Sequence, residues 1–298
     1  MMRTTLHEIG GVQILERAGD FIWRNARLLE RHLFAYHFAH ASRAHVVAAL
    51  RAYQNPDGGF GNALEPDKRC PDSQPIDAET ALHVLAAIGG DDTLVQDLCR
   101  YLDTITTAEG GVPFSLPSAR SYPHAPWWEA ADNPPASLNP TASIAGLLYQ
   151  LGVAHPWLSR ATAYCWRSLG AAPVTEMHEL RAVLHFLEHV PDRQRAEDAF
   201  SLVSRAMVEH HLVGLDVAAE GYTTKPLDLA PAPGSLCRRL FDDDLLAAHL
   251  DALAAAQQPD GGWSISWPPL SPACELEWRG VVTLNALKVL QAYGVIRA

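Results

Sequence analysis

The chain of 298 residues contains no long uninterrupted run of apolar residues. Because a helix that crosses a bilayer needs about 20 predominantly apolar residues, we expect no integral membrane segment. Lysine and arginine are scarce as well, 23 against 34 aspartates and glutamates, which leaves a formal net charge of −11. Binding to phosphates requires a basic surface, so nucleic acid is not an expected partner.

Cysteine is also rare and irregularly placed. The five cysteines are widely separated and include no Cys-x-x-Cys pair, which predicts reduced thiols and neither a disulfide framework nor a zinc knuckle. The stretch MMRTTLHEIGG lacks the apolar core of a signal peptide, and we therefore expect a cytoplasmic protein. Apolar residues make up 48% of the chain and charged residues 19%, which is typical of a soluble globular protein.

The most informative pattern is a phrase that occurs twice, as QNPDGGF from Gln54 and as QQPDGGW from Gln257. In each copy the second glycine lies 21 residues before a threonine in an apolar segment, Thr80 in PIDAETALHVLAAIG and Thr283 in GVVTLNALKVLQAYG. A turn and a following helix that recur at constant spacing indicate a repeat architecture.

Weaker copies lie in the interval between the two strong ones. The string EGGVPF begins at Glu109, and eroded candidates stand at Gly170 and Gly214. A repeat of roughly fifty residues accommodates two helices of typical length and two loops. The sequence therefore predicts about five or six helical hairpin repeats within one domain that spans residues 1–298.

Hydrophobic periodicity predicts that the repeats are helical throughout. Residues 92–107 carry large apolar side chains on one face, whereas SIAGLLYQLG and VVTLNALKVLQAYG are apolar nearly all round. A helix enclosed by other helices has the second pattern, so the alternation predicts an outer and an inner ring. Gly89, Gly152 and Gly294 stand where glycine commonly ends a helix.

Two proline-rich stretches, at 112–140 and 214–241, interrupt the helices. Long loops in compact domains are usually either functional or disordered. The first stretch contains Trp127 and Trp128, which favour order, and we expect it to cover another part of the chain.

The motif Gln-x-x-Asp-Gly-Gly-Phe/Trp, in its two copies at Gln54 and Gln257, resembles the repeat of the terpenoid cyclase and protein prenyltransferase superfamily, as in squalene-hopene cyclases. The resemblance implies an all-α fold, the α/α toroid, in which two concentric rings of helices surround a mostly apolar cavity. It also implies an isoprenoid or another elongated apolar molecule as the substrate, a small apolar or prenyl partner.

The catalytic motifs of that superfamily are missing. The chain has neither the Asp-x-Asp-Asp string with which class II cyclases protonate an alkene nor the Asp-Asp-x-x-Asp string that binds magnesium and diphosphate in class I enzymes. We therefore expect no cofactor, with magnesium needed only if the substrate is a diphosphate.

Acidic residues cluster after each strong copy of the phrase, ahead of the next helix. A carboxylic acid kept neutral in an apolar cavity can protonate an alkene, whereas an acid in a first helical turn can also simply complement the helix dipole. The first interpretation predicts the catalytic candidates Asp67, Asp77, Glu79, Glu275 and Glu277. Aromatic rings can stabilise cations, and the predicted substrate-binding residues are Glu65, Trp127, Trp128, Trp267, Trp278 and Arg279.

Two further clusters have ordinary explanations. Asp242, Asp243 and Asp244 precede an amphipathic helix, where acids in the first turn are favourable. His185 and His189 share one helical face, but a metal site would need a third ligand that the sequence does not indicate. We expect surface histidines here and no metal site.

Three hypotheses of function follow. The first is a terpenoid cyclase-like enzyme, an isomerase or lyase that uses acid-initiated carbocation chemistry in a central cavity. The second is a toroid that binds a lipid or peptide without chemistry, which the missing motifs favour. The third is a carbohydrate-active toroid that uses a pair of carboxylates about 5 to 10 Å apart. The oligomeric state is not indicated.

Overall fold

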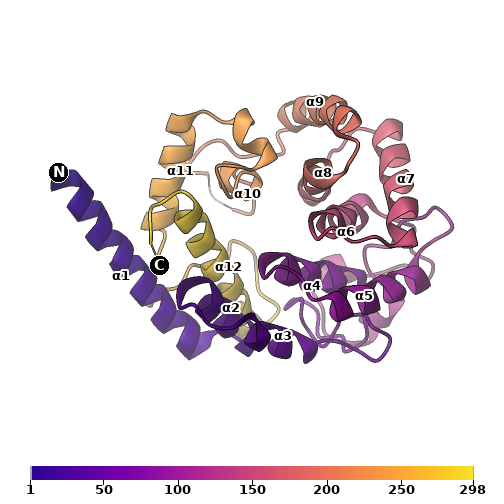
Figure 1. Cartoon of the computed structure of the whole chain (residues 1–298), viewed down its shortest axis with the longest axis horizontal. Coiled ribbons are helices and arrows are strands. Elements are labelled where there is room, and N and C mark those ends of the chain that lie inside the picture. Colours follow the sequence, from indigo (N-terminus) through magenta and orange to yellow (C-terminus); the bar gives the residue numbers. More distant parts are fainter. Residues whose placement is uncertain (1, 220, 298) are drawn as a thin grey trace. The chain divides into compact units, whose positions relative to one another are not determined.

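The computed structural model describes residues 2–219 and 221–297. In this part of the chain the secondary structure consists of twelve α-helices and three short 3-10 helices, with no β-strand (Figure 1). The backbone contacts divide the chain into two compact units. The first comprises Met1–Ala49 and Val213–Ala298, and the second comprises Leu50–Leu212. The single domain expected over residues 1–298 stays a prediction.

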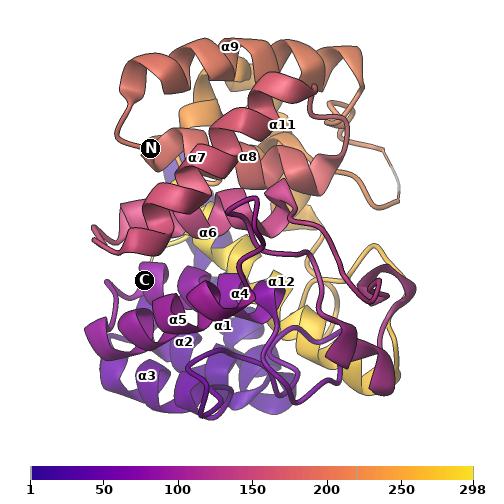
Figure 2. The same ribbon diagram turned by 90° about the vertical axis from the view of Figure 1, so that its right-hand side faces the viewer.

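The second unit is a series of helical hairpins. Helix α3 (Arg43–Arg51) leads into it, and the hairpins that follow are α4 (Pro75–Ala87) with α5 (Asp92–Ile105), α6 (Leu138–Gln150) with α7 (Pro156–Ala171), and α8 (Met177–His189) with α9 (Arg193–Glu209). Within the unit α4 packs on α6 and α6 on α8, while α5 packs on α7. The helices α4, α6 and α8 thus form one layer, here called the even layer, and α5, α7 and α9 form the odd layer (Figures 1 and 2).

The two layers differ in burial as the sequence predicts. In the odd layer, α5 buries one face, made of residues such as Leu94, Leu98 and Leu102. In the even layer, every residue of α6 from Pro140 to Leu148 is buried. Helices α6 and α8 pack closely, because Gly146 has no side chain and lies against the backbone carbonyl of His185. The predicted contrast between an amphipathic and an enclosed helix is therefore confirmed for α5 and α6.

The first unit joins both ends of the described chain. It contains α1 (Met2–Asn25), α2 (Leu28–Phe38), the short α10 (Pro226–Leu229), α11 (Asp243–Ala255) and α12 (Pro272–Ala292). Helix α12 packs against α1, α2 and α11. Among the described residues, no helix combines the length and the apolar character that a membrane span requires.

The glycine turns are joints between neighbouring helices. In each of three copies, the first glycine of the Gly-Gly pair has a left-handed backbone, with φ of +87°, +92° and +95° at residues 58, 110 and 261. A Cβ atom at these positions would strike a backbone carbonyl of a helix in the same unit: Asp97 of α5 for Gly58, Arg160 of α7 for Gly110, and Arg17 of α1 for Gly261. The turn after α11 therefore meets α1 in the way that the turn after α3 meets α5.

The glutamines at the start of the two strong copies stabilise these turns by hydrogen bonds. Gln54 Nε2 donates to the carbonyl of Gly58 at 3.4 Å. Gln257 Nε2 donates to the carbonyls of Gly261 and Ile14, each at 2.9 Å, and so connects the turn to α1. The repeated motif therefore has a structural role. The two weakest candidate copies do not form this kind of turn. Gly170 lies inside α7 and Gly214 packs on Thr223, and neither has a left-handed backbone, so the prediction of turns there is wrong.

Gly58→Ala is expected to destabilise the protein more than Gly89→Ala does. Both glycines have a left-handed backbone, which costs a residue with a Cβ about 1–2 kcal/mol, but only Gly58 lies against a carbonyl oxygen, 2.5 Å from the added Cβ. A Cβ added at Gly89 would face open space, so Gly89→Ala measures the cost of the left-handed backbone alone. Urea denaturation should give a loss of about 1–2 kcal/mol for Gly89→Ala and at least about 3 kcal/mol for Gly58→Ala. Equal losses would contradict the role of Gly58 as a joint.

Other local expectations are also confirmed. Gly89, Gly152 and Gly294 have a left-handed backbone just beyond the ends of α4, α6 and α12. Asp242 is the N-cap of α11, where its carboxylate accepts a hydrogen bond from the Leu245 amide at 2.7 Å. The five cysteines are free and buried, consistent with reduced thiols.

Candidate functional site

The first acidic cluster is organised by a buried ion pair in the second unit. Asp77 lies in the first turn of α4, and Lys68 lies in the loop between the first glycine turn and that helix. Both side chains are fully buried, and Lys68 Nζ donates to Asp77 Oδ2 at 2.5 Å. The other carboxylate oxygen of Asp77 accepts a hydrogen bond from the Glu65 backbone amide at 2.7 Å. Asp77 therefore fixes the loop onto the start of α4.

The first proline-rich stretch covers this loop, as the sequence predicts. The backbone amide of Arg69 donates to the carbonyl of Pro123, and the amide of Ala125 donates to the carbonyl of Asp67, each at 2.9 Å. Trp128 lies above the pair, with its ring centroid 5.2 Å from Lys68 Nζ. Ser115 Oγ donates to the carbonyl of Trp128 at 3.0 Å and holds this part of the stretch in place.

The predicted acids of this loop differ in how well each could donate a proton. A carboxylate that contacts an ammonium group and an amide N–H is stabilised in its charged form, so Asp77 is poorly suited to donate a proton. Asp67 immediately precedes Lys68, and only 2% of its surface is exposed. Glu65 is buried as well. Of the acids in this loop, Asp67 is the buried carboxyl group closest in the chain to the ion pair, and it remains the candidate proton donor.

The remaining predicted residues of this unit lie in different surroundings. Trp128 is buried and stacks on Phe114, with ring centroids 4.8 Å apart. Its neighbour Trp127 is 44% exposed. Glu79 lies one turn into α4, where its carboxylate is 3.8 Å from His83 Nε2. The prediction that Trp127 contacts a substrate stays a prediction.

The second acidic cluster belongs to the first unit and accompanies an aromatic cluster. Trp267 contacts both Tyr222 and Trp278 edge to face, with ring centroids 5.2 and 5.1 Å apart. The indole N–H groups of both tryptophans are buried, and neither has a hydrogen-bond partner among the described residues. Two predicted acids begin α12 nearby in sequence: Glu275 is exposed and Glu277 is half-buried.

Arg279 has contacts that tie α12 to the second glycine turn. Its guanidinium donates to Asp260 at 2.7 Å and to the carbonyl of Trp263 at 3.2 Å, and it lies 4.6 Å from the ring centroid of Phe21. The contact with Arg279 is the main reason that the pKa of Asp260 is lowered. These contacts give Arg279 a structural role, and its predicted part in substrate binding stays a prediction.

A depression of about 560 Å³ lies beside the first glycine turn, lined by residues that include Asn55, Asp57, Ser73, Tyr101 and Leu116. None of the predicted site residues lines it. The hydroxyl of Tyr101 is buried without a hydrogen-bond partner among the described residues. Burial, followed by the nearby charge of Asp57, raises the pKa of Tyr101 well above its ordinary value.

Histidines from two helices of the even layer also meet. The rings of His83 on α4 and His185 on α8 have centroids 5.6 Å apart, and those of His185 and His189 are 4.7 Å apart. Burial lowers the pKa of His185 to about 3, with His83 and His189 adding to the effect. Burial lowers the pKa of His189 too. The imidazole of His185 is therefore neutral near pH 7.

Comparison with known proteins identifies the fold class. No protein-family model matches the chain, and no curated protein matches it. Among solved structures, it is similar to a variant of MstE, a type II terpene cyclase from Scytonema, in complex with its substrate geranylgeranyl dihydroxybenzoate. The TM-score is 0.50 and the sequence identity is 15%, over 94% of this chain and 87% of that one.

The chain thus has the all-α fold of a terpenoid cyclase, the α/α toroid class that the doubled motif predicts. At this level of identity the likeness shows the fold alone, and activity has to be argued from the side chains.

Proposed function

We propose that the protein is a terpenoid cyclase-like enzyme that cyclises an isoprenoid or another elongated apolar substrate by protonating an alkene. The observation that carries the proposal is Asp67, a buried carboxyl group next to the buried Lys68–Asp77 pair, on the fold of a type II terpene cyclase. A buried carboxyl group can be kept neutral and so act as a general acid.

The proposed reaction conserves the atoms of the substrate. The carboxyl group of Asp67 gives its proton to one carbon of an alkene, and a second alkene attacks the resulting carbocation to form a ring. Loss of a proton from the last cation restores an alkene, so that the net change is an isomerisation. The backbone carbonyl of Asp67 accepts a hydrogen bond from the Ala125 amide, which holds this residue beneath the proline-rich stretch.

Magnesium has no step in this proposal. The chain has no Asp-Asp-x-x-Asp string to hold the ion against a diphosphate, and protonation of an alkene doesn't require the diphosphate to leave. A requirement for magnesium would instead accompany a reaction that begins with release of diphosphate.

A second candidate function is binding of an apolar molecule without chemistry. It is favoured by the missing Asp-x-Asp-Asp string and by the ion pair that engages Asp77, one of the five predicted catalytic acids. The carbohydrate-active alternative stays a prediction.

The experiment that separates these functions is incubation with a panel of apolar substrates. The panel contains prenyl diphosphates of ten to thirty carbons, squalene and geranylgeranyl dihydroxybenzoate, the substrate named for the similar Scytonema cyclase. A cyclic isomer with the mass of its substrate is the expected product. Saturable binding without turnover would favour the second candidate, and release of diphosphate would contradict proton-initiated chemistry.

A further inference from the structure

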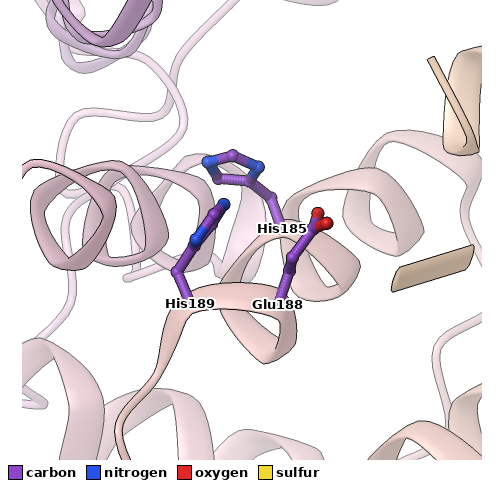
Figure 3. Close-up of side chains that lie close together, drawn as sticks. All are labelled: His185, Glu188 and His189. Carbon is purple, nitrogen blue, oxygen red and sulfur yellow. The ribbon is translucent and has the colours of Figure 1, made fainter. Parts of the chain in front are cut away.

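We propose a binding site for a divalent transition metal ion of the zinc class on α8, formed by His185, Glu188 and His189. One ligand atom from each residue lies within 4.8 Å of those from the other two. Figure 3 shows the three side chains projecting to the same side of the helix. The sequence indicates two of these ligands but not a third, and Glu188 supplies it. This inference is independent of the proposed cyclase activity.

The spacing of the ligands suits zinc. Histidines four residues apart on a helix form the usual two-histidine zinc pair. With metal–nitrogen distances of about 2.0–2.1 Å, ligand atoms around a tetrahedral ion are about 3.3 Å apart. The ligands therefore need to approach by about 1.5 Å at most, a movement that side-chain rotation provides.

The surroundings of the three residues favour a cation. His189 is the last residue of α8, and the carbonyl end of a helix carries a partial negative charge. The Nε2 atom of His185 is buried and has no hydrogen-bond partner among the described residues, which leaves a costly polar atom that a metal ion would satisfy. All three residues are half-buried.

The neighbouring charged and titratable groups come from the start of α9 and from α4, and the positive charge of Arg193 near His189 opposes a cation. The guanidinium of Arg193 donates to the backbone carbonyls of Leu187, Glu188 and Val190, and these bonds occupy it at the end of the helix. On the side of α4, His83 lies against the ring of His185, and Glu79 lies 3.8 Å from His83. Neither belongs to the group of three ligands.

The test uses the whole protein without a histidine tag, freed of metal by a chelator and then titrated with Co²⁺ and with Zn²⁺. We expect one Co²⁺ ion per chain with the absorption of a tetrahedral nitrogen and oxygen site, and displacement of that ion by Zn²⁺. His189→Ala and Glu188→Gln should each weaken binding at least about tenfold. The matched control is His178→Ala, at the other end of α8, where the exposed imidazole is 2.6 Å from Glu176.

Each outcome decides the proposal. Loss of binding in His189→Ala and Glu188→Gln, with normal far-UV circular dichroism and with His178→Ala unchanged, supports it. Equal binding in all four proteins would overturn it, as would sulfur-to-cobalt charge-transfer bands, which would place the ion on cysteines. An unaltered protein that binds no Co²⁺ at micromolar concentration would also overturn it.

Discussion

Replacing Asp77 by asparagine, or Lys68 by methionine, should each lower the free energy of unfolding by about 3–5 kcal/mol. Each change leaves the other partner as an uncompensated charge at a position with no exposed surface. Asparagine keeps an oxygen that can accept from the Glu65 amide, so the loss in Asp77→Asn reports on the charge more than on the loop contact. Urea denaturation followed by circular dichroism provides the measurement.

The double variant Lys68→Met/Asp77→Asn provides the sharper part of this prediction. It removes both charges together, and replacement of a buried ion pair by neutral groups is often close to neutral in stability. The double variant should therefore be more stable than either single variant. As a control, Asp132→Asn removes the partner of Arg120 in an exposed pair and should change stability by less than about 1 kcal/mol. Additive losses in the double variant would contradict a coupled pair.

Asp67→Asn should abolish cyclisation while the protein still binds its substrate. Positioned acids contribute about 10²- to 10⁴-fold to rates, and an amide cannot donate the proton that starts the reaction. Asp67→Glu, which keeps the acid but moves it, should retain part of the activity. Product formation is measured by mass spectrometry, and substrate binding by equilibrium dialysis.

The control for Asp67→Asn is Asp72→Asn, an exposed acid in the same loop, which should leave turnover unchanged. If Asp67→Asn retains full activity, the acid is a different residue, and Glu79, Glu275 and Glu277 become the next variants. If Asp67→Asn loses binding as well as turnover, its role is structural, like that of Asp77.

The fold could be predicted from the sequence to a large extent because its signals are local. The left-handed glycines at 58 and 261 belong to the repeated Asp-Gly-Gly motif, which by itself predicts a turn. Gly89 and Gly294 follow helices whose apolar pattern ends just before them. The structure at the weak copies could not be predicted from such local signals. Gly170 is a helical glycine in open space, and a lone glycine does not distinguish a joint from a tolerated helix position.

The candidate site depended on contacts that no local pattern specifies. Lys68 is adjacent to predicted acids in the sequence, but its pairing with Asp77 arises because the loop folds back onto the first turn of α4 beneath Trp128. From the sequence alone, Arg279 can be interpreted as a substrate ligand. Its hydrogen bond to Asp260 gives it a structural role at the second glycine turn. Glu188 of α8 is identified as a third ligand only by the position of its side chain near His185 and His189.

Cyclisation in D₂O is the most direct test of alkene protonation as the protein's chemistry. A carboxyl group that exchanges with solvent delivers one deuteron to the substrate, so the cyclic product should be one mass unit heavier per initiation. The account predicts this labelled product from the unaltered protein and none from Asp67→Asn. A cyclic product without solvent deuterium, or one formed only with magnesium and release of diphosphate, would contradict it.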